Sequence, residues 1–129
     1  MTIILSHVTL GVRDLGRAIA FYDAVLGELG IARGKTGEAF AGWGPAHEAS
    51  FFITRPFDGQ PASAGNGVSV SFLAPSRGAV DRFWRKAKAL GAGDEGKPGL
   101  RPHYHRDYYA AYVRDPDGNK VAAVCHGSG

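Results

Sequence analysis

The stretch His7-Val-Thr-Leu-Gly-Val-Arg-Asp14 is matched 62 residues later by Ser69-Val-Ser-Phe-Leu-Ala-Pro-Ser76. Each stretch alternates as a half-buried strand does, and each ends on Asp or Ser, the residue types that cap helix N-termini. An apolar repeat of helical period follows each cap. The sequence therefore predicts two like units of about 60 residues whose halves meet around a shared cleft.

The remaining strand and turn signals predict the same order of elements in both halves. Strands are expected at 3–12, 31–35, 38–43, 49–54, 68–74, 108–114 and 120–125, and 92–107 reads as loop with room for one short strand. Helices of about 15 residues follow Asp14 and Ser76, and Asp115-Pro-Asp-Gly-Asn119 is a turn. The order is βαβββ, twice. We expect one domain over 1–129, with module one at 1–54, a connector at 55–66 and module two at 67–126.

Composition excludes several classes of partner. The net charge of +3 comes from scattered basic residues, and the densest group, in the predicted second helix, is typical of a solvated face rather than a phosphate track. No apolar run approaches the roughly 20 residues that span a bilayer, and the N-terminus lacks the pattern of a secretory signal. The single cysteine, Cys125, fits a reducing compartment. We therefore expect a cytoplasmic protein without nucleic-acid or membrane partners.

Four pieces of sequence carry a resemblance to a known family. They are Ser6-His7-Val8, Ala20-Phe21-Tyr22 with Leu26-Gly27, Ala74-Pro-Ser76, and Tyr112-Val-Arg-Asp-Pro-Asp-Gly-Asn-Lys-Val121. With the doubled βαβββ order, the chain resembles the vicinal oxygen chelate superfamily of glyoxalase/bleomycin-resistance/dioxygenase proteins. The resemblance implies an α+β fold, in which two modules form a bent mixed sheet around a central cleft with helices outside. Many members pair, so it also implies a homodimer, although both modules lie in one chain.

The resemblance also implies four positions for metal ligands. In metal-using members, His on the first strand and Glu on the last strand of each module hold a divalent ion. His7 matches the first position, but Ser69 and Ala122 stand where His and Glu are expected, and 49–54 contains no carboxylate. Catalytic zinc usually takes three protein ligands. We expect a degenerate metal site with His7 as the one matched ligand, and either no cofactor or a weakly held divalent metal.

Two other groups of residues could contribute chemistry. If 103–105 is extended, His103 and His105 share a face and could hold a metal; the alternative is a polar loop. Arg101 could bind a carboxylate or phosphate, or could be an ordinary surface charge. Pairing Arg114 with Asn119 would place Tyr109 and Ala122 on the inward face, whereas a slip of one residue would reverse that assignment.

The sequence thus predicts a protein that binds a small, partly apolar molecule in an aromatic-lined cleft. The expected ligand-binding residues are His7, Trp43, Phe52, Ser69, Arg101, His105 and Tyr109. The alternative is a divalent-metal-dependent lyase, isomerase or dioxygenase of the same superfamily, and the sequence leaves open whether any reaction is catalysed.

Overall fold

A computed structural model describes residues 4–45 and 48–129. The elements are β1 (Val8–Gly11), α1 (Leu15–Gly27), β2 (Arg33–Thr36), β3 (Phe40–Trp43), β4 (Phe51–Thr54), β5 (Ser69–Leu73), α2 (Arg77–Ala89), β6 (Gly93–Leu100), β7 (Tyr109–Arg114) and β8 (Lys120–Cys125). The predicted order, βαβββ twice, is confirmed. None of the helices in the described part of the chain is long and apolar enough to cross a membrane.

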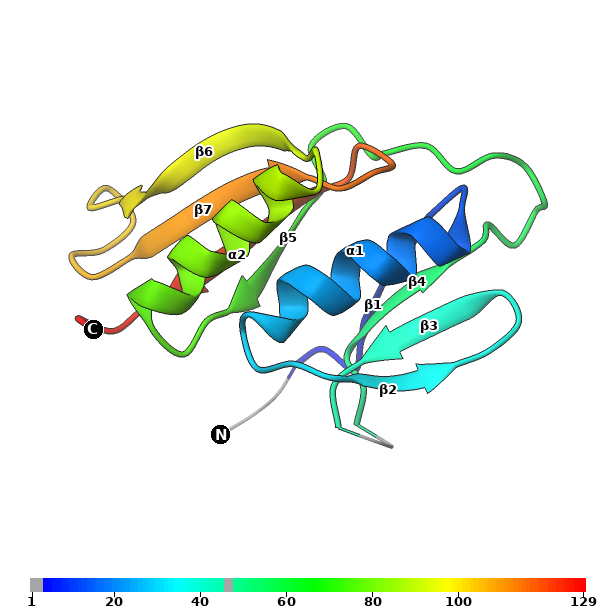
Figure 1. The fold of residues 1–129 in the computed structure, drawn as a ribbon, viewed down its shortest axis with the longest axis horizontal. Helices are drawn as coiled ribbons and strands as arrows, with labels where there is room; N and C mark the ends of the chain where they lie inside the picture. Colours follow the sequence, from blue (N-terminus) through cyan, green and yellow to red (C-terminus); the bar gives the residue numbers. More distant parts are fainter. Residues whose placement is uncertain (1–3, 46–47) are drawn as a thin grey trace.

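Each module contributes one four-stranded mixed sheet. The strand orders are β1-β4-β3-β2 and β5-β8-β7-β6. In each sheet, the first strand along the chain pairs in parallel with the last one along the chain, β1 with β4 and β5 with β8. The two helices lie next to each other and cover the same side of the pair of sheets (Figure 1). No helix of the described residues covers the other side of either sheet, so a ligand could reach the strands from that side.

Both helices begin where the sequence predicts. The Asp14 carboxylate accepts a hydrogen bond from the backbone N–H of Arg17 at 3.1 Å, and the Ser76 hydroxyl accepts one from Ala79 at 3.1 Å. Each cap satisfies a backbone donor that the first helical turn leaves without a partner.

One hydrophobic core runs through both modules. Every second strand residue faces the helices, and Phe51 is one of these residues. The centre of its ring lies 4.9 Å from the ring centre of Tyr22 in α1 and 4.8 Å from that of Phe72 in β5. These edge-on and tilted contacts tie the first module to the second by aromatic packing.

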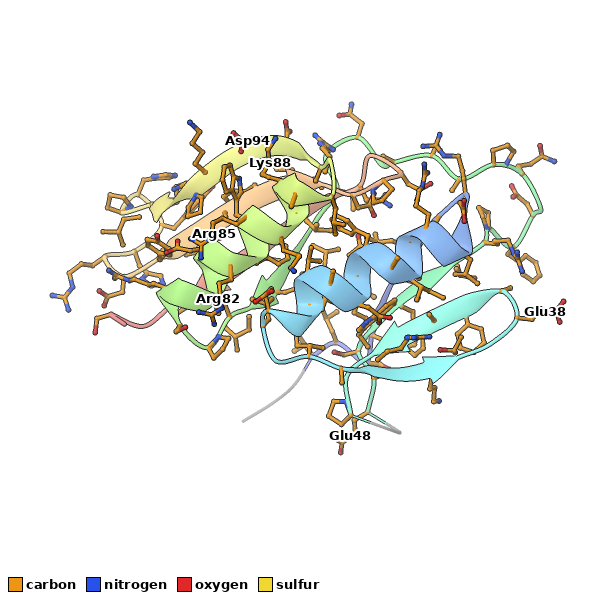
Figure 2. The ribbon with its side chains drawn as sticks, in the orientation of Figure 1. Glu38, Glu48, Arg82, Arg85, Lys88 and Asp94 are labelled. Carbon is orange, nitrogen blue, oxygen red and sulfur yellow. The ribbon has the colours of Figure 1, made fainter. Side chains whose placement is uncertain are left out.

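The basic residues of α2 behave as a solvated face. Arg82, Arg85 and Lys88 lie along the outer side of the helix (Figure 2). Arg82 pairs with Glu28 at 3.5 Å, and Lys88 donates to the backbone carbonyl of Ala92 at 3.1 Å.

Strand β6 corrects the prediction for 92–107. It has 8 residues and pairs with β7 through two register irregularities. Three glycines and a proline within it remove the alternation by which a strand is recognised in sequence. Residues 93–100 therefore form a strand because β7 offers them hydrogen-bonding partners, not because their own sequence pattern favours one.

The register of β7 and β8 corrects a second prediction by one residue. Arg114 pairs with Lys120, not Asn119, and Ala122 therefore lies opposite Tyr112. Asn119 belongs to the turn instead, because its carbonyl accepts from the backbone N–H of Asp115 at 2.9 Å. This difference of one residue in the pairing exchanges the two faces of β7 relative to the prediction. Tyr109 packs with the core under α2, and Tyr112 lies on the opposite side of the sheet.

Candidate functional site

We use the term open face for the side of the two sheets that lies opposite α1 and α2. Its residues alternate along the strands with those of the core: Thr9, Phe40, Phe52, Ser69, Ser71, Leu73, Ala110, Tyr112, Ala122 and Val124. Leu73, the last residue of β5, is 70% exposed on this face. The aromatic residues that this uncovered side also carries, Phe40, Phe52 and Tyr112, make the open face a candidate binding surface.

In module one, the open face brings together two of the predicted site residues. The ring of Phe52 meets His7 edge-on at 5.4 Å and lies 6.2 Å from Phe40. His7 is exposed, and its Nδ1 lies 2.8 Å from the hydroxyl of Ser6. Because that contact involves Nδ1, the Nε2 atom is left as the one that could meet a ligand.

In module two, the open face carries two neighbouring tyrosines, Tyr108 and Tyr112, with two cations close to the Tyr112 ring. We call this pair of tyrosines the Tyr112 platform. The guanidinium of Arg101 lies 5.6 Å and the ammonium of Lys120 5.4 Å from the ring centre of Tyr112. The hydroxyls of Tyr108 and Tyr112 are 3.3 Å apart. Burial first, and then the Tyr108 hydrogen bond, raise the pKa of Tyr112 to about 12, so its phenol is neutral at physiological pH.

Gly96 of β6 makes room for this arrangement. A Cβ at that position would lie 3.0 Å from Cδ1 of Tyr112 and 3.1 Å from Nη2 of Arg101. The same Nη2 donates a 2.8 Å hydrogen bond to the carbonyl of Lys97. The missing side chain therefore lets the ring and the guanidinium lie together against the strand.

Beside the Tyr112 platform, two histidines form a pair that the sequence did not predict. Nε2 of His105 lies 2.8 Å from Nδ1 of His126, and the backbone N–H of Asp107 donates to Nδ1 of His105 at 3.2 Å. Because Nδ1 of His105 accepts, its proton is on Nε2, which then donates to His126. Residues 101–108 form turns rather than a strand, so the condition for a His103–His105 pair is not met. The signal in the sequence for this pair was His126, which directly follows the predicted strand ending at Cys125.

Two predicted residues lie away from the open face. The indole of Trp43 is 1% exposed and donates to Asp23 at 3.1 Å, and it borders a separate pocket of about 390 Å³ beside the end of α1. The hydroxyl of Tyr109 donates to Asp81 of α2 at 2.6 Å, which raises the pKa of Tyr109. The placement of Tyr109 in a central cleft is therefore wrong, and the aromatic residue of β7 on the open face is Tyr112.

The model of the glyoxalase/bleomycin resistance protein/dioxygenase superfamily matches residues 4–123. The chain belongs to that superfamily. A glyoxalase/bleomycin resistance protein from Albidiferax ferrireducens has a similar crystal structure, with a TM-score of 0.84 and 41% identity over 95% of this chain and 98% of that one. An uncharacterized protein from Pseudomonas aeruginosa is 35% identical over 91% of this chain and 84% of its own length. A lactoylglutathione lyase of Arabidopsis thaliana is 30% identical, but this chain spans only 44% of its length.

The strand pairing shows which residues stand at the four metal-ligand positions that the resemblance implies. Thr9 pairs with Phe52 in module one, as Ser71 pairs with Ala122 in module two, so Phe52 and Ala122 occupy equivalent positions. The four positions thus hold the imidazole of His7, a hydroxyl, a phenyl ring and a methyl group, a donor set that does not fit a tightly held divalent ion. Within 4–45 and 48–129, no three His, Cys, Asp or Glu side chains converge as metal ligands would.

Proposed function

We propose that this superfamily member binds a small, partly apolar anion on the open face of module two, without a tightly held metal. One observation carries the proposal. The two cations beside Tyr112, Arg101 and Lys120, have no carboxylate partner within 4.0 Å among the described residues. Unpaired positive charges beside aromatic rings favour a ligand that supplies both a negative group and an apolar body.

The surrounding residues support the same ligand class. Tyr108 and Tyr112 pack over Ala110, Ala122 and Val124, a small apolar cluster separate from the main core. The hydroxyl-bearing Ser69 and the imidazoles of His7 and His105 lie on or beside the exposed surface, and their contact with a ligand stays a prediction. In this proposal the phenols and imidazoles orient the ligand, while Arg101 and Lys120 bind its charge.

A metal-dependent lyase, isomerase or dioxygenase is the second candidate. Its support is the likeness to the Arabidopsis lactoylglutathione lyase together with the one matched ligand position, His7. The two candidates predict different effects of removing metal with a chelator. Ligand binding by Arg101 and Lys120 beside the Tyr112 platform should survive chelation, whereas a metal-dependent reaction should be lost.

The decisive experiment uses 1-naphthoate as probe, with 1-naphthalenemethanol as its neutral counterpart, on protein treated exhaustively with a chelator. We expect saturable naphthoate binding, weakened about tenfold or more in Arg101→Gln because a charge-assisted hydrogen bond contributes about 1.5–3 kcal/mol. Arg106, whose side chain is 93% exposed in the same loop, gives the matched control, and Arg106→Gln should leave affinity unchanged. Equal affinities in the two variants would contradict the proposal. Binding that requires added metal and is lost in His7→Ala would favour the metal-dependent alternative.

A further inference from the structure

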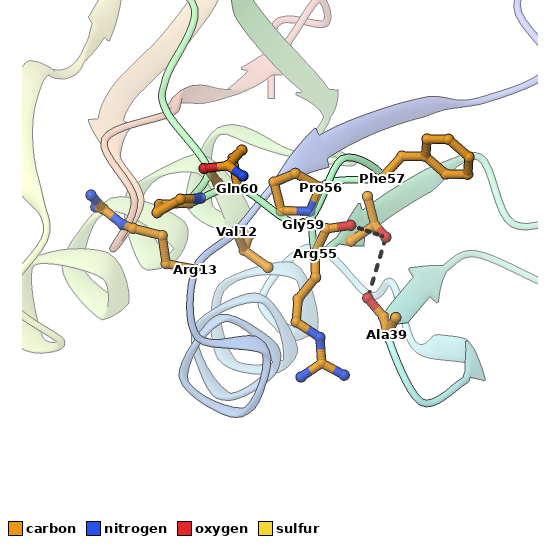
Figure 3. Close-up of a pocket in the computed structure, with 11 residues that line it drawn as sticks. Val12, Arg13, Ala39, Arg55, Pro56, Phe57, Gly59 and Gln60 are labelled. Carbon is orange, nitrogen blue, oxygen red and sulfur yellow. Dashed lines mark hydrogen bonds between the residues drawn. The ribbon is translucent and has the colours of Figure 1, made fainter.

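A pocket of about 840 Å³ lies between module one and the connector, where β1 and β4 end and residues 55–62 turn back along the sheet (Figure 3). We call it the connector pocket. Its lining residues fall between positions 12 and 62, so it is built without the Tyr112 platform of module two. None of the predicted site residues lines it, and it has the volume of a typical small-molecule site.

The wall formed by residues 55–62 is held in place by several contacts. The backbone N–H of Arg55 donates to the carbonyl of Ala39 at 2.9 Å, and Gly59 closes a turn on the carbonyl of Pro56 at 3.1 Å. Ala62 is buried against Gly11 of β1, where an added Cβ would lie 3.3 Å from that of Ala62. A wall restrained by packing and by proline loses little conformational entropy when a ligand binds.

The lining combines apolar surface with two arginines. Val12, Pro56 and Ala62 are apolar, and no Asp or Glu is among the lining residues. Arg13 and Arg55 lie on either side of Val12 (Figure 3). The pocket therefore has apolar walls and a positive rim.

The two arginines are not equally available to a ligand. The backbone N–H and Nε of Arg13 both donate to Oδ1 of Asp117, at 2.8 and 3.1 Å, so a carboxylate already balances this charge. Arg55 donates through Nη2 to the carbonyl of Glu38 at 2.6 Å and has no carboxylate within 4.0 Å among the described residues. A backbone carbonyl orients the guanidinium but leaves its charge uncompensated, so Arg55 is the group that an anion would meet.

We infer that the connector pocket is a second ligand site, which takes a small organic anion with an apolar body, such as a medium-chain carboxylate. The carboxylate binds Arg55, and the apolar body lies along Val12, Pro56 and Ala62. The side chain of Phe57 is fully exposed at the rim, and a bound apolar chain would remove part of its surface from water. This site is independent of the function proposed for the open face.

The test measures binding of decanoate, with decanol as the neutral counterpart, by calorimetry and by amide chemical-shift mapping. We expect shifts at Ala39, Arg55 and Gly59, and an affinity at that site at least about tenfold lower in Arg55→Gln. Ala39 is exposed at the pocket, so Ala39→Trp should obstruct it and weaken those shifts without disturbing the fold. Decanol should bind wild-type protein about as weakly as decanoate binds Arg55→Gln.

Two controls separate this site from other cationic surfaces. Arg85 is an exposed arginine on α2, and Arg85→Gln should leave the decanoate shifts unchanged (Figure 2). Arg101→Gln should leave them unchanged too, whether or not the open face binds naphthoate. The inference is overturned if decanoate gives no saturable shifts at the connector pocket. It is equally overturned if Arg55→Gln and Ala39→Trp have no effect, or if Arg101→Gln alone removes binding.

Discussion

The hydroxyl of Tyr22, in α1 of module one, donates a 2.6 Å hydrogen bond to Oδ2 of Asp115, in the turn between β7 and β8 of module two. Oδ1 of Asp115 accepts from the backbone N–H groups of Asp117 and Asn119, both at 2.9 Å. The side chain of Asn119 donates to Oδ2 of Asp115 at 3.0 Å and to the carbonyl of Gly11 at 3.1 Å. One buried carboxylate therefore organises the turn and also joins the two modules.

Replacing Tyr22 by Phe should destabilise the protein by about 1–3 kcal/mol, because a buried hydrogen bond to a charged group is lost while Asp115 stays buried. The free energy of unfolding in urea at pH 7 measures this effect. Tyr104 is largely exposed, so Tyr104→Phe is the matched control and should change stability by less than about 0.5 kcal/mol. Equal stabilities of Tyr22→Phe and wild type would contradict a joining role for the bond.

Alkaline pH should reduce the stability that the Tyr22–Asp115 hydrogen bond contributes. Burial first, and then the neighbouring Asp115 charge and hydrogen bond, raise the pKa of Tyr22 well above its ordinary value. The unfolded chain loses this proton near pH 10 while the folded chain keeps it, so the folded state binds more protons and stability falls as pH rises beyond about 10. Below that pH the group contributes no pH dependence. Urea unfolding between pH 8 and 11 should show a steeper loss for wild type than for Tyr22→Phe, and parallel curves would refute the assignment.

The phenol of Tyr112 should ionise at a pKa of about 12 in the folded protein, since burial and the contact with Tyr108 disfavour the phenolate. The measurement is the phenolate absorbance of wild type minus that of Tyr112→Phe, recorded by stopped-flow pH jump before the chain unfolds. A midpoint near 10, the value of a free tyrosine, would mean that the ring is solvated and not packed on the sheet.

The tautomers of the histidine pair can be read directly by nitrogen-15 NMR. His105 should carry its proton on Nε2, because Nδ1 accepts from Asp107, and Nδ1 of His126 should be unprotonated. In His126→Ala the Nε2 proton of His105 should lose its protection from exchange with water, whereas His103→Ala should leave it protected. A proton found on Nδ1 of His105 would show that the pair does not form in solution.

Much of the fold could be predicted because its signals are local. Asp14 and Ser76 lie where their side chains reach the backbone of the first helical turn, and no distant residue is needed for that. The alternation in 7–14 and 69–76 likewise belongs to single strands. Strand β6 lacked such a signal, because its three glycines interrupt any alternation of apolar and polar residues. It forms because it pairs with β7, a contact between distant segments.

The candidate site was predicted less well, because it depends on register and on contacts between distant segments. His7 and Phe52 do lie together, but Trp43 packs toward α1, and His105 meets His126 rather than His103. The connector pocket could not be foreseen, since its walls come from the segment after β1, the end of β4 and the turn at Pro56, which only folding brings together.

The two βαβββ modules, the helix starts and the family could be predicted from the residues alone, because periodicity, caps and motifs act over a few residues. That Tyr112 rather than Tyr109 reaches the open face follows from the strand register of the folded protein. Asn119 joins the turn, where it also donates to Gly11 of the other module, and this moves the pairing of β7 and β8 by one residue. Successive strand residues point to opposite sides, so a shift of one residue exchanges every side chain between the core and the open face.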